Sequence, residues 1–320
     1  MDGGKVGTAV SSIGSGGNDN DDDGDADVVA PIIAKTPGGV NMDKQAETLK
    51  ELRTVIAAQQ ELLRIALYMM TQGPIAFSDQ ELKCSLEEDQ VRAACAVAMG
   101  AGQSLNTILK LSDDQGIGIR DLYPIARSVV EGFLNAAFFV TQPVDISRRA
   151  LEHRHFAAWK HRNRIIGNGE IMISIGAANP KTEAARLFPD FAEKGKDSWT
   201  ALNAVDRISK IGKVVKASGG ALIGAYAGIY AVSSEIIHGS VYGMSYFFSA
   251  HVREQTVEGF KSGTVEQVID ILIAVSHASS GFLSAFANVQ KLGPFVLAEH
   301  EMFKRLFRAA TGGDWQGQDE

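Results

Sequence analysis

Apolar residues recur at helical spacing along most of the chain. Between Asp43 and Thr71, leucines and isoleucines three or four residues apart predict a long amphipathic helix, which Gly73-Pro74 ends. The same spacing predicts further helices over 79 or 85 to 111, 121–139, 145–166, 180–194, 198–216, 220–238, 264–290 and 296–310. Sustained alternation with period two is missing, and only 170–175 suggests a short strand. We therefore expect an all-α helical bundle.

The two ends of the chain differ in composition from the middle. Residues 1–40 are rich in Gly, Ser and Asp, and their seven Asp against two Lys give a net charge of −5. Residues 314–320 carry a further −3, so the total of −7 leaves 41–313 close to neutral. We expect disordered acidic tails at 1–40 and 312–320 around a single helical domain at 41–311. Net charge alone therefore excludes no class of partner.

The number of cysteines, the first residues and the longest apolar stretch predict the cellular compartment. Cys84 and Cys95 are the only cysteines, too few for a disulfide framework or a thiolate zinc site. The first residues show no basic segment followed by an apolar one, as a secretory signal would. The apolar stretch Ala221–Val232 is interrupted by Ser233, Ser234 and Glu235 before it reaches the length of a membrane span. We expect a cytoplasmic protein without a membrane partner.

Two polar clusters lie in otherwise apolar predicted helices. Arg127, Glu131 and Asn135 are spaced by four residues and share one helix face. Tyr230, Ser234 and His238 are also spaced by four, with Glu235 three residues before His238. One interpretation is a structural network in which Arg127 pairs with Glu131 or Glu235. The other is a site in which His238 carries protons or contacts phosphate, and Arg127 holds an anion.

These two clusters carry a resemblance to a known group of proteins. The motif is Arg127-Ser128-Val129-Val130-Glu131 followed a hundred residues later by Tyr230-x-x-x-Ser234-x-x-x-His238. It resembles a bacterial helical family of unknown function, related in turn to the HEPN superfamily of nucleotide-binding helical bundles. The resemblance implies a bundle that binds RNA or nucleotides, and some superfamily members are metal-independent ribonucleases.

The ribonuclease motif of that superfamily is only partly present. It places an Arg four to six residues before a His on one helix, whereas Ala231–Ile237 contains no Arg. Arg127, from another helix, would have to replace it. The candidate catalytic residues of the two clusters are Arg127, Glu131, Tyr230, Ser234, Glu235 and His238. In a ribonuclease, His238 would act as general acid and base and Arg127 would stabilise the charge on the phosphate.

A basic helix follows the first cluster. Six Lys and Arg residues lie between 148 and 164 against Glu152 alone, with aromatic residues between them. This composition is typical of a solvated helix face, and also of a surface that contacts phosphates and stacks on bases. The candidate nucleic-acid-binding residues are Arg148, Arg149, Arg154, Trp159 and Lys160.

Other features bear on cofactors and assembly. His153 and His155 are two residues apart and point to different sides of a helix, so we expect no metal and no cofactor. His277, flanked by serines, is typical of a core histidine but could complete the site from an opposite wall. Gly220, Gly224 and Gly228 form a small-residue stripe that allows another helix to approach closely. We expect a homo-oligomer.

Three functions agree with these patterns. The first is a HEPN-like protein that binds RNA or nucleotides, with ribonuclease activity as its enzymatic form. The second is a non-enzymatic interaction or oligomerisation protein whose polar clusters are structural. The third is a pocket for a small anion without nucleic acid.

Overall fold

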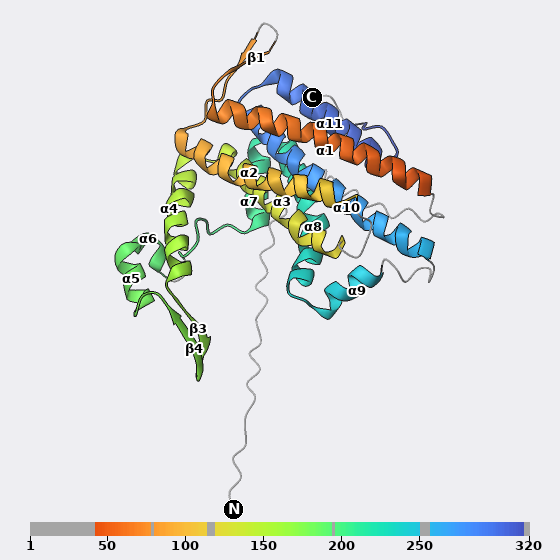
Figure 1. The fold of residues 1–320 in the computed structure, drawn as a ribbon. Helices are drawn as coiled ribbons and strands as arrows, with labels where there is room; N and C mark the ends of the chain where they lie inside the picture. The colour runs from red at the N-terminus through yellow and green to blue at the C-terminus, as the bar shows by residue number, and fades with distance from the viewer. Residues whose placement is uncertain (1–41, 78–79, 114–118, 194–195, 250–256, 317–320) are drawn as a thin grey trace, which may run out of the picture. The chain divides into compact units, whose positions relative to one another are not determined.

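The all-α fold is confirmed by the structure, a computed structural model that describes residues 42–77, 80–113, 119–193, 196–249 and 257–316 (Figure 1). The described helices are α1 (Met42–Thr71), α2 (Glu88–Leu111), α3 (Ile119–Thr141), α4 (Val144–Arg162), α5 (Pro180–Leu187), α6 (Pro189–Ala192), α7 (Ala204–Val214), α8 (Lys216–Ile237), α9 (Val241–Ser249), α10 (Val257–Val289) and α11 (Gly293–Thr311). The strands are β1 (Ile75–Phe77), β2 (Gln80–Leu82), β3 (Arg164–Asn168) and β4 (Ile171–Ile175). The predicted N-terminal tail, 1–40, lies outside the described residues.

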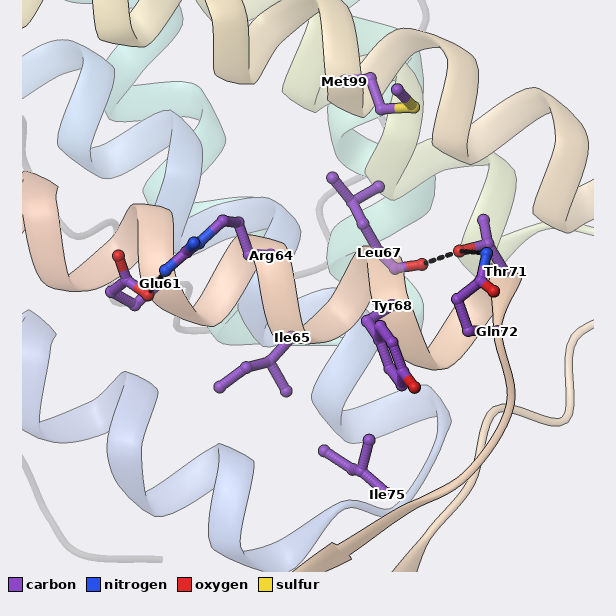
Figure 2. A pocket seen from close by; sticks show the side chains of 9 residues that line it. All are labelled: Glu61, Arg64, Ile65, Leu67, Tyr68, Thr71, Gln72, Ile75 and Met99. Atoms are coloured by element: carbon purple, nitrogen blue, oxygen red, sulfur yellow. Dashed lines mark hydrogen bonds and ion pairs between the residues drawn. The ribbon is translucent and has the colours of Figure 1, made fainter.

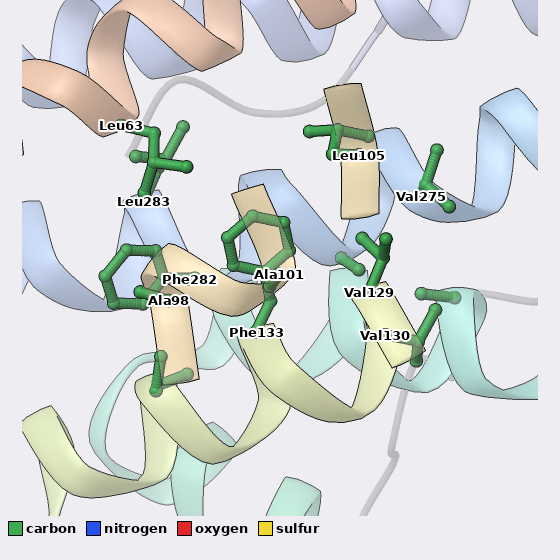
Figure 3. Packing of buried hydrophobic residues seen from close by; sticks show 14 of the residues in the cluster. Leu63, Ala98, Ala101, Leu105, Val129, Val130, Phe133, Val275, Phe282 and Leu283 are labelled. Carbon is green, nitrogen blue, oxygen red and sulfur yellow. The ribbon is translucent and has the colours of Figure 1, made fainter. Parts of the chain in front are cut away.

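The core forms around α3 and α10. Helix α3 packs against α2, α7, α8 and α10, while α10 also contacts α1 and α11. The rings of Phe133 and Phe282 stack across the α3–α10 contact, with centroids 5.8 Å apart and planes at 14°. Figure 3 shows these rings among fully buried aliphatic side chains such as Leu105 and Val275. Burial of this apolar surface is the main term that holds the bundle together.

The start of α2 differs from the earlier of its two predicted starts. Residues 75–82 form a short antiparallel hairpin, β1–β2, in which Ile75 pairs with Leu82. Helix α2 begins at Glu88, where the Gln90 side chain accepts from the Glu87 N–H at 3.2 Å in a capping box. Strands of three residues are too short to show alternation in the sequence, so the hairpin was not predicted.

The fourth helix ends earlier than its spacing predicts. Helix α4 stops at Arg162, and Asn163 binds the Trp159 carbonyl at 2.9 Å with its side-chain amide. Residues 164–166, predicted as the end of that helix, instead belong to β3, which pairs with β4 across a turn that contains Gly169 at φ 61°. The prediction for 164–166 was wrong because Ile165 and Ile166 continue the apolar spacing of the preceding helix, although they lie in a strand. The suggested strand near 170–175 corresponds to β4.

Helices α7 and α8 approach each other unusually closely. A Cβ added to Gly219 would lie 2.5 Å from the Gly212 Cα, so this contact requires glycine. Helix α7 begins at Ala204, where the Asn203 side chain caps the Asp206 N–H at 2.9 Å. The prediction for 198–216 placed this start several residues too early.

The last helix closes the described bundle. Arg305 of α11 pairs with Glu51 of α1 at 2.7 Å, and Gly312 ends the helix in a left-handed conformation. Trp315 then packs edge-on to Phe303 and Phe307. The first residues of the predicted C-terminal tail thus contact α11, while 317–320 lie outside the described residues. Helix α9 was not predicted.

Candidate functional site

Arg127 and Glu131 of α3 meet Tyr230 of α8. The Arg127 Nε donates to Glu131 Oε1 at 2.8 Å, and its guanidinium carbon lies 4.3 Å from the centre of the Tyr230 ring. The Arg127 side chain is 22% exposed. Burial lowers the pKa of Arg127, but the hydrogen bond and charge of Glu131 outweigh it and raise that pKa. The guanidinium is thus held by its Nε and by its face.

A second arginine reaches the same place from α7. Arg207 Nη1 donates to Asn135 Oδ1 of α3 at 2.7 Å, and the guanidinium lies 5.3 Å from the Trp199 ring centre. Its Nε is buried and has no hydrogen-bond partner among the described residues. Burial lowers the pKa of Arg207, against the opposing charge of Glu131. Glu131 therefore lies within electrostatic reach of both arginines.

Tyr226, one turn before Tyr230, completes the group. The two tyrosine rings stack with centroids 4.4 Å apart and planes at 23°. Burial and the neighbouring Tyr230 raise the pKa of Tyr226, so its hydroxyl stays protonated at neutral pH. We call Arg127, Glu131, Asn135, Arg207, Tyr226 and Tyr230 the arginine–tyrosine cluster. Its formal charges sum to a single positive charge at a partly exposed surface of α3, α7 and α8.

The remaining residues of the predicted catalytic set lie further along α8. Glu235 accepts a hydrogen bond from the Ser240 hydroxyl, and half-buried Ser234 lies one turn beyond Tyr230. His238 is exposed at the C-terminal cap of α8, about 12 Å along the helix axis from Tyr230. The structure thus brings Arg127, Glu131 and Tyr230 together and leaves Ser234, Glu235 and His238 outside this contact.

Three members of the cluster were not in the predicted catalytic set, and of these only Asn135 had been placed beside Arg127 and Glu131 by its spacing. Tyr226 could have been found, because it lies four residues before Tyr230 and shares its helix face. Arg207 could not, because it meets Asn135 through the packing of α7 on α3, and these two residues are 72 positions apart in the sequence. Its position depends on a contact distant in sequence.

The comparisons with known proteins cover this region. The model of a family of unknown function (DUF5677) matches residues 98–255, slightly less than half of the chain. The matched segment contains the whole arginine–tyrosine cluster. No curated protein and no solved structure matches the chain.

Most of the candidate nucleic-acid-binding residues of α4 have partners within the protein. Arg148 pairs with Asp89 at 3.3 Å, and Lys160 pairs with Asp197 at 3.0 Å. Arg149 donates to backbone carbonyls of 196 and 198, and its guanidinium lies 4.5 Å from the Phe191 ring centre. These contacts fasten the segment 188–198 to α4.

The aromatic residues of α4 serve the same packing. Trp159 lies against Phe188, with ring centroids 5.9 Å apart, and buried Phe156 stacks on Phe191. Arg148, Arg154 and Lys160 are all exposed, but Arg154 differs from the other two because it has no acidic partner among the described residues. It contacts the neighbouring His155 ring, at 3.5 Å.

A separate polar network lies within the core between α1, α10 and α11. Gln59 exchanges hydrogen bonds with Ser276, and Ser280 donates to Glu299 Oε1 at 2.6 Å. His277, in the same part of α10, faces the Phe303 ring at 5.9 Å, and its Nδ1 is buried without a partner among the described residues. His277 therefore faces α11, and its ring contact is unrelated to the arginine–tyrosine cluster.

A shallow pocket of about 640 Å³ lies beside the end of α1, mostly before the matched family segment. Figure 2 shows Ile65, Tyr68 and Ile75 around it, with Met99 of α2 on another side. The pair Glu61–Arg64 forms its charged rim. The lining of this pocket is mainly apolar, so its residues carry no polar motif in the sequence.

The described helices bear on metal binding and on membrane insertion. The described part of the chain contains no group of three or more His, Cys, Asp or Glu side chains placed to hold a metal ion. Two helical stretches, Lys216–Ile237 and Gly263–Val289, are long and apolar enough to cross a membrane by length and composition. The second lies largely in the core, with 78% of its apolar segment buried, whereas the first is 28% buried.

Proposed function

We propose that the protein binds a phosphate-bearing ligand, a nucleotide or RNA, at the arginine–tyrosine cluster. The observation that carries the proposal is the state of Arg127. Its Nε donates to Glu131 and its guanidinium face lies on the Tyr230 ring, while its two Nη groups make no hydrogen bond within the described residues. A guanidinium held in this way presents paired donors to an anion without a large loss of side-chain entropy.

The neighbouring groups suit the same ligand class. Arg207 adds a second positive charge, and the hydroxyl of Tyr226 remains a donor at neutral pH. The stacked rings of Tyr226 and Tyr230 offer an aromatic edge to a base, and stacking tolerates any base identity. The sequence resemblance to the HEPN superfamily points to the same ligands. Together these features favour nucleotides over a small anion alone.

Binding is favoured over cleavage. A metal-independent ribonuclease needs a general acid or base within hydrogen-bond reach of the same phosphate that the arginine holds. His238, the candidate for that role, is exposed about 12 Å along α8 from Tyr230. The proposed activity is therefore ligand binding, with ribonuclease activity as the less supported form.

The test is thermal unfolding of the full chain with ATP, UMP and a short oligouridine, followed by Arg127→Gln. A ligand at about 100 times its Kd stabilises the folded state by about 2.7 kcal/mol, which is an easily measured shift. We expect wild type to shift and Arg127→Gln to lose the shift while staying folded. Arg64→Gln is the matched control, because Arg64 also pairs with a glutamate of its own helix but lies outside the cluster.

The second candidate function is a non-enzymatic interaction protein in which the cluster is only a structural network. The contacts that Arg127 makes through its Nε with Glu131 and through its guanidinium face with Tyr230 favour it. That function is indicated if no ligand shifts the wild type and Arg127→Gln lowers its unfolding temperature. An oligouridine affinity that falls steeply with salt and weakens in Arg154→Gln would instead extend the interface to α4.

A further inference from the structure

Helix α8 presents an outward face that no described element covers. Gly220, Gly224, Ala227 and Ala231 share one side of the helix at intervals of four, three and four residues. A Cβ added to Gly220 or Gly224 would meet nothing within 4 Å, and both alanines and Ile223 are exposed or partly so. Gly228, in contrast, faces Ala274 of α10. The predicted glycine stripe is thus corrected to these four residues.

The charges on this face are arranged against the dipole of their own helix. Lys216 is the first residue of α8, at the positive end of the helix dipole, and Glu235 lies in its last turn, at the negative end. Lys216 has no acidic partner among the described residues. Each charge lies beside the helix end of like sign, and the Ser240 hydroxyl compensates Glu235 only by one hydrogen bond. An antiparallel copy of the same helix would place each charge beside the helix end of opposite sign.

The positions of these residues fit such a pairing. Lys216 and Glu235 are equally far from the midpoint between Gly224 and Ala227, and so are Gly220 and Ala231. A twofold axis through that midpoint would therefore place Lys216 against Glu235 of the partner and the small residues against one another. A twofold interface uses the same patch on both subunits, as this arrangement requires.

We propose that the protein forms a twofold homodimer in which α8 packs antiparallel against α8 of a second copy. Small residues allow the two backbones to approach closely, and the paired charges fix the register. Val241 and Tyr242, at the start of α9, are exposed apolar side chains that follow the roughly 33 Å length of α8. A lipid surface fits this face less well, because glycine and alanine gain little from apolar burial.

The experiment is sedimentation equilibrium of the full chain, which reports the mass against 34.2 kDa for one copy. We expect wild type to be dimeric and Ala227→Trp to be monomeric, because the bulky ring separates the helices. Ala46→Trp is the matched control, since Ala46 is an exposed alanine of α1. Unchanged thermal unfolding of Ala227→Trp would show that the fold survives.

Charge reversal tests the register. Lys216→Glu and Glu235→Lys should each raise the dimer dissociation constant about tenfold, and the double variant should recover it. Lys50→Glu, on α1, should have no effect. A monomeric wild type, a dimer insensitive to Ala227→Trp, or a double variant that fails to recover would overturn the proposal. Flotation of monomeric protein with anionic phosphatidylserine vesicles would overturn it in favour of a membrane surface.

Discussion

Ser280 of α10 donates its hydroxyl to the buried carboxyl of Glu299 on α11, with 2.6 Å between the two oxygens. No basic side chain pairs with Glu299 among the described residues, and its exposed fraction is 8%. Burial raises the pKa of Glu299 from 4.5 to about 7, although the Ser280 hydrogen bond acts in the opposite direction. The contact between α10 and α11 therefore contains a carboxyl group that prefers to be neutral.

This preference makes stability depend on pH. Because the folded-state pKa is raised, the contribution of Glu299 to stability is fully present below pH 4.5 and is lost as pH rises through about 7. Each pKa unit corresponds to about 1.4 kcal/mol, so the total loss is about 3 kcal/mol. We expect Glu299→Gln to be more stable than wild type at pH 8 by about that amount, as measured by urea unfolding.

The comparison with Glu301→Gln controls for the removal of a charge from α11, since Glu301 is exposed. At pH 4 wild type and Glu299→Gln should have nearly equal stability, because the carboxyl is protonated in both states. If the free energies of unfolding of wild type and Glu299→Gln differed equally at pH 4 and pH 8, the raised pKa of Glu299 would be contradicted.

The burial of His277 should make stability depend on pH in the opposite direction. Burial lowers its pKa from 6.5 to about 4, so the folded state prefers the neutral ring. Its contribution to stability is present above pH 6.5 and is lost as pH falls through about 4, by about 3 kcal/mol in total. We expect His277→Gln to reduce acid destabilisation between pH 6.5 and 4. Exposed His155→Gln should leave the acid limb unchanged, and a similar effect of both variants would refute the role of burial.

Two glycines of α8 should respond oppositely to alanine. At Gly219 a Cβ would lie 2.5 Å from the Gly212 backbone, so Gly219→Ala must push α7 and α8 apart and should cost about 1–3 kcal/mol. At Gly224 the Cβ meets nothing within the same copy, so at concentrations where the protein is monomeric Gly224→Ala should stabilise by up to about 1 kcal/mol through helix propensity. Chemical unfolding of both variants measures the difference. Equal effects would mean that the α7–α8 crossing is not tight.

The aromatic stack in the core predicts a large loss. Phe133 is fully buried against Phe282, so Phe133→Ala should cost about 3–5 kcal/mol through lost burial and a residual cavity. Phe77→Ala is the control, since Phe77 is about half exposed on the β1–β2 hairpin. Denaturant unfolding should separate the two variants clearly, and a small effect at Phe133 would show that the α3–α10 contact can collapse around the gap.

Parts of the candidate site could be predicted from the sequence because they depend on one helix at a time. The four-residue spacing placed Arg127 with Glu131, and it would have placed Tyr226 with Tyr230. The spacing could not show that His238 ends its helix exposed while Tyr230 turns to α3. Which side of a helix meets a neighbour depends on packing partners far along the chain.

The sequence by itself determined the helical fold and most helix positions, because apolar residues at a period of 3.6 must be buried on one side of a helix. It also determined that Arg127 and Glu131 are neighbours. Only the tertiary structure decided that Arg207 joins them, that most basic residues of α4 have internal partners, and that Gly224 is open while Gly219 is not. These relations follow from contacts between distant segments, which local periodicity does not encode.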